Sequence, residues 1–175
     1  MTKYKIEKQY RLPDYDYSKP AIYFITINSW DKNHFFGKIG NQEMFLSDIG
    51  NFVERNLATI AEKVKHLVIE ESAIMPDHIH LLVRILNISP LAELQIDNAE
   101  QAQHDDDGSA TTIRPLQKKS IPSFVNHFKG KVKRWCNEHG HEDFEWGNRY
   151  HDMIIRDERH YHNVIMYIRN NVRNW

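Results

Sequence analysis

Histidine is the residue type that first suggests chemistry in this chain, with 11 copies among 175 residues. Three pairs are spaced two residues apart: His78 with His80, His139 with His141, and His160 with His162. Two neutral imidazoles on one rigid face can supply half of a metal-ion site. Residues two apart share a face on a strand but not on a helix, so the elements around each pair decide which one is suited to a metal.

The expected local structure favours His78 and His80. The last pair falls in a predicted helix, where its members point about 200° apart, and Gly140 places the middle pair in a flexible turn. His78 and His80 instead open a predicted strand, with Ile79 turned toward the core. The alternative is that both are simply half-buried polar residues on the exposed face of the sheet.

Further ligands must come from another element, and the last predicted helix offers Tyr167 and Asn171. They are four residues apart and therefore lie on one helical face. If that face covers the sheet beside the two histidines, a phenol and an amide oxygen converge on two imidazoles. Such a mixed nitrogen and oxygen site suits Mg²⁺ or Mn²⁺ better than a closed structural zinc site. The alternatives are a core aromatic for Tyr167 and a helix C-cap for Asn171.

Hydrophobic periodicity predicts the elements that must hold these residues. The predicted strands are Ala21–Asn28, His66–Met75, Ile79–Leu86 and Phe144–Arg156, with a short hairpin across Phe35 to Leu46. The predicted helices are one capped by Ser47 or Asp48, one that begins at Pro122, and one capped by Asp157. This order predicts an α+β fold: a ferredoxin-like, four-stranded antiparallel sheet with helices on one face, plus an additional C-terminal helix that carries the tyrosine.

Length and composition indicate one domain over residues 1–175, because 41% apolar content over this length suits a single core. The single Cys136 excludes an internal disulfide and a cysteine-rich zinc site. No apolar run approaches 18 residues and residues 1–5 are polar, so we expect a cytoplasmic protein with no membrane segment.

Two segments stand apart from the predicted core. Residues 1–20 are polar and aromatic with two prolines, which predicts an extended N-terminal arm whose Tyr10, Tyr15 and Tyr17 could stack on bases. Residues 87–119 contain an acidic, glutamine-rich run and predict a flexible insertion. The net charge is −1, but residues 118–175 carry eleven basic and seven acidic residues, which permits a phosphate ligand without proving one.

Several motifs together resemble one family. The run from Met75 to His80 (MPDHIH) is similar to the HUH motif, and the run from Tyr167 to Asn171 (YIRNN), followed by Trp175, resembles the C-terminal signature of the REP-associated tyrosine transposases. The segments RLPDYDY at residues 11–17 and WGNRYHD at residues 146–152 also resemble this group. Two positions depart from it: Asp77 stands where the family usually has Asn, and Val172 where it has Pro.

The resemblance implies cleavage and rejoining of single-stranded DNA by a monomer or homodimer. It assigns His78, His80 and Asn171 as ligands of a divalent metal, Mg²⁺ or Mn²⁺, and Tyr167 as the nucleophile that forms a 5′-phosphotyrosine. A phenol with a pKa near 10 needs a nearby cation or base to react at pH 7. No nucleotide cofactor is expected, since no GxxxxGK[ST] motif is present.

The expected DNA is a single strand, most simply one that folds into a hairpin. Basic residues expected at its backbone are Lys129, Lys133, Arg134, Arg149, Arg156 and Arg169. Two other functions are weighed against this one. A module that binds DNA or RNA hairpins without cutting them would need the basic residues but not Tyr167. A metal-free phosphoesterase with paired HxT or HxS motifs is disfavoured, because the chain contains neither.

Overall fold

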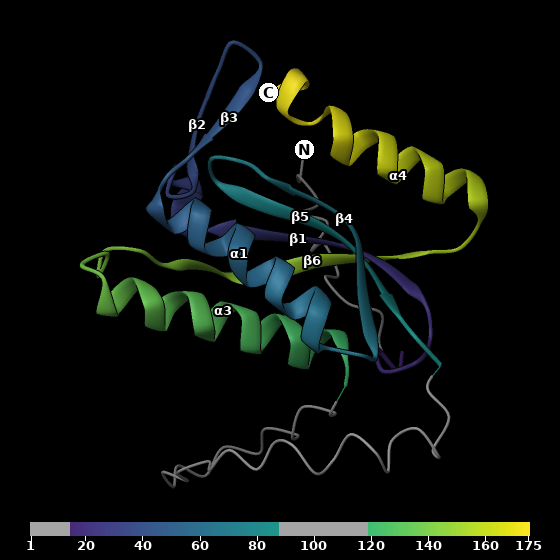
Figure 1. Ribbon diagram of the computed structural model, residues 1–175. Helices are drawn as coiled ribbons and strands as arrows, with labels where there is room; N and C mark the ends of the chain where they lie inside the picture. Colours follow the sequence, from purple (N-terminus) through teal and green to yellow (C-terminus); the bar gives the residue numbers. More distant parts are fainter. Residues whose placement is uncertain (1–14, 88–118) are drawn as a thin grey trace, which may run out of the picture.

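The computed structural model describes residues 15–87 and 119–175 (Figure 1). The predicted arm is therefore described only from residue 15 to residue 20. The predicted acidic insertion over 87–119 is described only at its two end residues. The remainder of both predictions lies outside the described residues.

A four-stranded antiparallel sheet forms the centre of the fold. Its strands are β1 (Ile22–Ser29), β4 (Leu67–Ile74), β5 (His78–Ile85) and β6 (Trp146–Ile155). They pair in the order β4-β5-β1-β6, which places the first and third core strands in the middle. This is the ferredoxin-like order, so the predicted α+β fold is confirmed.

The helices lie on both faces of this sheet. Figure 1 shows α1 (Asp48–Lys63) and α3 (Ile121–Glu138) on one face and α4 (Glu158–Asn170) on the other. Each helix begins where a side-chain oxygen accepts a hydrogen bond from a backbone N–H of the first turn. The three capping residues are Ser47, Ser120 and Asp157. Two of them, Ser47 and Asp157, are the caps expected from the sequence.

Short elements connect the core strands. A one-turn helix, η1 (Trp30–Lys32), follows β1, and a hairpin of β2 (Gly37–Gly40) and β3 (Glu43–Leu46) precedes α1. A second turn, η2 (Val172–Asn174), follows α4. Within the described ranges, every helix is too short or too polar to cross a bilayer.

Alternation along β1 divides the sheet into a core face and a second face. Tyr23, Ile25 and Ile27 are fully buried in the core that includes α1 and α3. The intervening Phe24 belongs instead to a smaller apolar cluster with residues of α4. Successive side chains of a strand point to opposite faces, so every second residue counted from Phe24 faces the same way. Thr26 therefore also faces the α4 side.

The last residues of the predicted arm are part of the core. Tyr17 is buried and its ring lies 5.9 Å from that of Tyr23, while Tyr15 packs edge-on against Tyr17. Burial of Tyr17 contradicts its predicted stacking on bases, whereas this role stays a prediction for the half-buried Tyr15.

Two glycines on different helices give a test of this packing. A Cβ on Gly50 of α1 would lie 2.1 Å from the carbonyl oxygen of Phe36, whereas one on Gly130 of α3 would meet no atom within 4 Å. We expect Gly130→Ala to raise the free energy of unfolding by about 0.5–1 kcal/mol, because alanine favours a helix. Gly50→Ala should instead lower it by about 1–3 kcal/mol through overpacking. Urea unfolding measures both, and a stabilising Gly50→Ala would contradict the close approach.

Candidate active site

His78 and His80 project from the start of β5 toward α4. Both lie on the face of β5 opposite Ile79, which is fully buried in the core. Their Nε2 atoms are 3.0 Å apart, and their ring centroids are 4.5 Å apart. The strand therefore brings the two ring nitrogens to one point.

A polar neighbour occupies the Nδ1 atom of each ring. Asp77 Oδ1 lies 2.5 Å from His78 Nδ1, and Thr26 Oγ1 lies 2.9 Å from His80 Nδ1. Thr26 reaches His80 because the two residues are directly opposed in the β1–β5 register. A carboxylate can only accept, so His78 donates Nδ1–H to Asp77 and presents the lone pair of Nε2.

The electrostatics keep His80 neutral. Burial lowers the pKa of His80 to about 3, and the neighbouring His78 adds to that effect. A neutral imidazole whose Nδ1 donates to the Thr26 hydroxyl presents a second lone pair at Nε2. Two lone pairs that face each other at hydrogen-bond distance repel, and a cation between them removes that repulsion.

Tyr167 approaches the same point from α4. Its hydroxyl lies 3.3 Å from His80 Nε2, where the phenol O–H donates to the ring nitrogen. The Tyr167 ring packs edge-on against Phe24, with centroids 5.9 Å apart. About half of the side chain, 52%, is exposed, so the hydroxyl lies beside the buried His80 imidazole and also within reach of a ligand from solvent.

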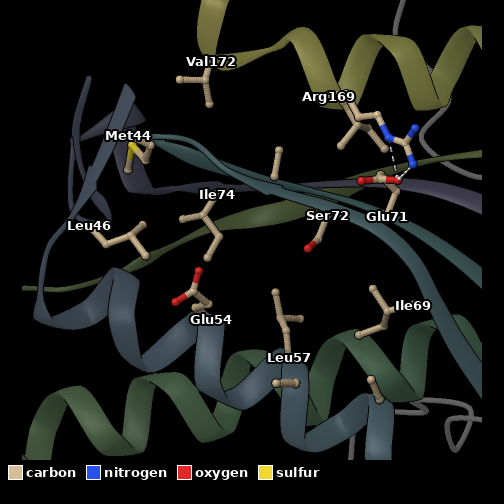
Figure 2. Close-up of a pocket in the computed structure, with 14 residues that line it drawn as sticks. Met44, Leu46, Glu54, Leu57, Ile69, Glu71, Ser72, Ile74, Arg169 and Val172 are labelled. Carbon is tan, nitrogen blue, oxygen red and sulfur yellow. Dashed lines mark hydrogen bonds and ion pairs between the residues drawn. The ribbon is translucent and has the colours of Figure 1, made fainter. Parts of the chain in front are cut away.

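Two kinds of contact hold α4 on this face. Val164 and Ile168 are buried in a cluster with Leu82 of β5. Figure 2 shows Arg169 reaching from α4 to Glu71 on β4, where both Nε and Nη2 lie within 3.0 Å of one carboxylate oxygen. Tyr167 directly precedes the buried Ile168. Because Ile168 packs against the sheet, the Tyr167 phenol lies at the edge of the interface between α4 and the sheet.

Asn171 caps α4 one turn after Tyr167. It is buried, with 9% of its surface exposed, and its Nδ2 has no hydrogen-bond partner within the described parts of the chain. A buried amide without a partner is unfavourable by about 1–3 kcal/mol. Rotating the amide by 180° presents oxygen in place of nitrogen, which is the atom that a hard cation binds.

These donors fit a divalent cation. Two convergent imidazole nitrogens, each oriented by a polar neighbour, match the usual arrangement of metal-binding histidines. The described residues contain no group of three or more His, Cys, Asp or Glu side chains that could hold a metal. Further protein ligands could come from the end of α4, where the Tyr167 phenol lies beside His80 and the buried Asn171 amide has no hydrogen-bond partner among the described residues.

The structure gives Lys129 and Lys133 a role that differs from the predicted one. Lys129 Nζ donates to the Gly147 carbonyl at 2.8 Å, and burial lowers its pKa. Lys133 Nζ donates to the Phe144 carbonyl at 2.6 Å and pairs with Glu145. Both tie α3 to the chain around the start of β6, on the sheet face away from Tyr167. Their contact with DNA stays a prediction.

The predicted arginines fall in four different places. Arg134 is exposed on α3, which lies on the sheet face opposite α4, and Arg169 is paired with Glu71. Arg156 is exposed just after β6. Arg149, by contrast, lines a hollow at the start of β6 together with Asn28, the residue opposite His78 in the sheet register.

The other histidine pairs occupy surfaces remote from this centre. His139 and His141 both stack on Trp135, with centroids 4.3 and 5.7 Å from it. His160 and His162 lie near the start of α4, as expected for a helix.

Three contributors to the site were not assigned a role from the sequence. In the sequence, Asp77 is notable only as a departure from the HUH pattern. An acidic residue next to a candidate metal-binding histidine can, however, indicate a residue that orients the histidine ring. Thr26 could be found only from strand register. The Trp175 ring lies 5.7 Å from His78, and no local pattern indicates that contact.

Comparison with known proteins gives one relative in sequence. An uncharacterized protein of Haemophilus influenzae is 32% identical over 166 residues, which cover 94% of this chain and 87% of that protein. The chain belongs to the family of this protein. No protein-family model matches the sequence.

Comparison with solved structures addresses the fold. The structure of a REP-associated tyrosine transposase bound to a REP hairpin matches with a TM-score of 0.57 and 14% identity, over 94% of this chain and 79% of that one. This chain has the fold of the REP-associated tyrosine transposases. A candidate transposase of Deinococcus radiodurans matches with a TM-score of 0.47 and 17% identity, over 91% and 95% of the two chains.

Substitution of Asp77 tests the metal fit in this transposase fold. Asp77→Ala removes the acceptor that orients His78, and we expect it to weaken Mn²⁺ binding by about 10–100-fold. Asp77→Asn keeps an oxygen acceptor for Nδ1–H, so its loss should be much smaller. Isothermal titration with Mn²⁺ measures both affinities. Equal affinity of Asp77→Ala and the unsubstituted protein would contradict the orienting role.

Proposed function

We propose that this protein is a metal-dependent enzyme that nicks and rejoins single-stranded DNA, with Tyr167 as its nucleophile. The observation that carries this proposal is the 3.3 Å distance between the Tyr167 hydroxyl and His80 Nε2, beside the second imidazole of His78. This position supports the proposal because the phenol lies next to two convergent imidazole nitrogens while about half of the side chain stays open to a ligand from solvent.

His78, His80 and Asn171 would hold the cation, Mg²⁺ or Mn²⁺. When bound, the cation supplies a positive charge that stabilises the phosphorane-like transition state and favours the phenolate. The protein residues do the positioning. β5 fixes the two imidazoles, and α4 fixes the phenol against Phe24, so that the nucleophile and a phosphate drawn to the centre meet in one orientation.

The reaction exchanges one phosphoester for another. The Tyr167 oxygen, having lost its proton, forms a bond to phosphorus, and the bond from phosphorus to the 3′ oxygen breaks. The departing oxygen takes up a proton and becomes a free 3′-hydroxyl, while the 5′ side of the break remains attached as a phosphotyrosine. Attack by a 3′-hydroxyl reverses the step. Because the ester bond energy is kept, rejoining needs no nucleotide cofactor.

The exposure of Tyr167 supports a single-stranded substrate, since a flexible strand can bring its phosphate to a phenol at the rim of a helix. The solved relative in fold is bound to a REP hairpin, which supports a hairpin-forming DNA as partner. We propose that the protein recognises unpaired DNA next to such a hairpin.

A covalent-adduct assay tests the activity. A pool of single-stranded hairpins with randomised unpaired flanks carries a fluorophore at the 3′ end, because the attached fragment is the one on the 3′ side of the break. With Mn²⁺ we expect a labelled protein band that resists denaturation and is lost with EDTA. Tyr167→Phe should abolish it, by at least about 1,000-fold, since no other nucleophile replaces the phenol.

Tyr161 provides the matched control, because it is a second tyrosine on α4. Tyr161→Phe should retain the labelled band. DNA binding with no band in the unsubstituted protein would favour a non-catalytic DNA-binding module, and binding only of the RNA version of the pool would favour an RNA ligand. A band that survives Tyr167→Phe would contradict the assignment of the nucleophile.

A further inference from the structure

A hollow of about 710 Å³ lies at the end of the sheet beside the histidine pair. Its volume is in the range of sites for small organic groups. The lining side chains that the following argument uses are Asn28, Trp30, Asp31, Lys32, Asn148 and Arg149. They come from the end of β1, from η1 and from the start of β6, so two strands and a turn border this open hollow.

The hollow is joined to the candidate active site through the backbone. Asn28 lines it and is also the residue opposite His78 in the β1–β5 register. The next residue, Ser29, donates from both N–H and Oγ to the carbonyl of Asp77, at 2.9 Å in each case. A group held in the hollow is therefore placed at a fixed position relative to His78.

Trp30 forms an exposed aromatic wall of this hollow. Half of its side chain, 50%, is accessible, which is unusual for so large an apolar group. Its backbone is fixed all the same, because its N–H donates to the Glu145 carbonyl at 2.8 Å and its own carbonyl accepts from Asn33. An exposed indole on a hydrogen-bonded backbone is suited to stacking on a flat ring.

The two residues after Trp30 have an unfavourable backbone conformation. Asp31 and Lys32 have φ angles of 50° and 53°, in the left-handed region that residues with a Cβ rarely adopt. Ser29 stabilises this turn, because its Oγ also donates to the Asn33 carbonyl at 2.7 Å. The result is that both side chains line the hollow.

The polar groups around the indole match the parts of a nucleotide. Lys32 and Arg149 supply positive charge for a phosphate. Asn28 and Asn148 offer amides, and Asp31 offers a carboxylate, which together can donate to and accept from the edge of a base. A flat ring, a hydrogen-bonding edge and an anion combined in one ligand describe an unpaired nucleotide.

We propose that this hollow binds one unpaired nucleotide of the DNA strand whose neighbouring phosphate reaches Tyr167, with its base stacked on Trp30. The inference rests on the proposed function and adds the place where the strand is gripped beside the break. It makes Trp30 a binding residue that sets the position of the strand, and it requires no chemistry from Trp30 itself.

Photochemical cross-linking tests the contact directly. The probe is a 20-nucleotide random single strand in which 5-iododeoxyuridine replaces thymidine, and the protein carries Tyr167→Phe so that no cleavage intervenes. Irradiation followed by peptide mass spectrometry should identify Trp30 as a major cross-linked residue, and excess single-stranded DNA should compete. A cross-link map that omits Trp30 would overturn the proposal.

Affinity measurements provide a second test with matched variants. Trp30→Ala should raise the Kd for this single strand about tenfold, since stacking on an aromatic ring contributes strongly to such binding. Trp30→Phe, which keeps a ring, should stay within about threefold of the parent. Phe45→Ala removes a ring of similar exposure, 49%, that does not line the hollow, and should leave the Kd unchanged.

Failure of this inference is distinguishable from failure of the proposed function. If Trp30→Ala binds as tightly as the parent while the labelled covalent band still forms, the hollow is not a nucleotide site and the enzyme proposal stands. If Trp30 cross-links but no band ever forms, strand binding stands without cleavage. Circular dichroism of Trp30→Ala and Trp30→Phe confirms that each is folded before its Kd is interpreted.

Discussion

The site depends on the close approach of two imidazole nitrogens, one from His78 and one from His80. The other nitrogen of each ring already has a polar neighbour. Asp77 and Thr26 bind the Nδ1 atoms of His78 and His80, and the Nε2 atoms are left 3.0 Å apart. Burial lowers the pKa of His80 to about 3, so protonation of His80 does not relieve this contact near pH 7. A fold that places two acceptor nitrogens together in this way is prepared for a cation.

One face of the sheet carries the larger core and the other carries the candidate site. The face toward α1 and α3 contains the larger apolar core, and Lys129 and Lys133 tie α3 to the chain around the start of β6. The face toward α4 has a smaller apolar cluster and receives the imidazoles and the phenol. Rigidity on one side thus fixes the strand register that brings Thr26 and Asn28 beside the histidines on the other.

Sequence patterns predicted the elements well because burial imposes a period on each of them. Alternation around Ile79 indicated which face His78 and His80 share, and helical spacing placed Tyr167 with Asn171. The carbonyl partners of Lys129 and Lys133 were not predicted, because a helical period shows where a side chain points but not which carbonyl groups lie near its end. Thr26 and Trp30 depend on pairing across strands and on a left-handed turn, which no local pattern in this sequence reveals.

The most direct measurement of the central claim is the anomalous difference density of crystals of the full chain grown with Mn²⁺. The account predicts one peak in bonding distance of Nε2 of both His78 and His80, with the Tyr167 oxygen beside it and the Asn171 amide turned toward it. Density that shows the two imidazoles hydrogen-bonded to each other with no ion, at Mn²⁺ concentrations that load other sites, would contradict it.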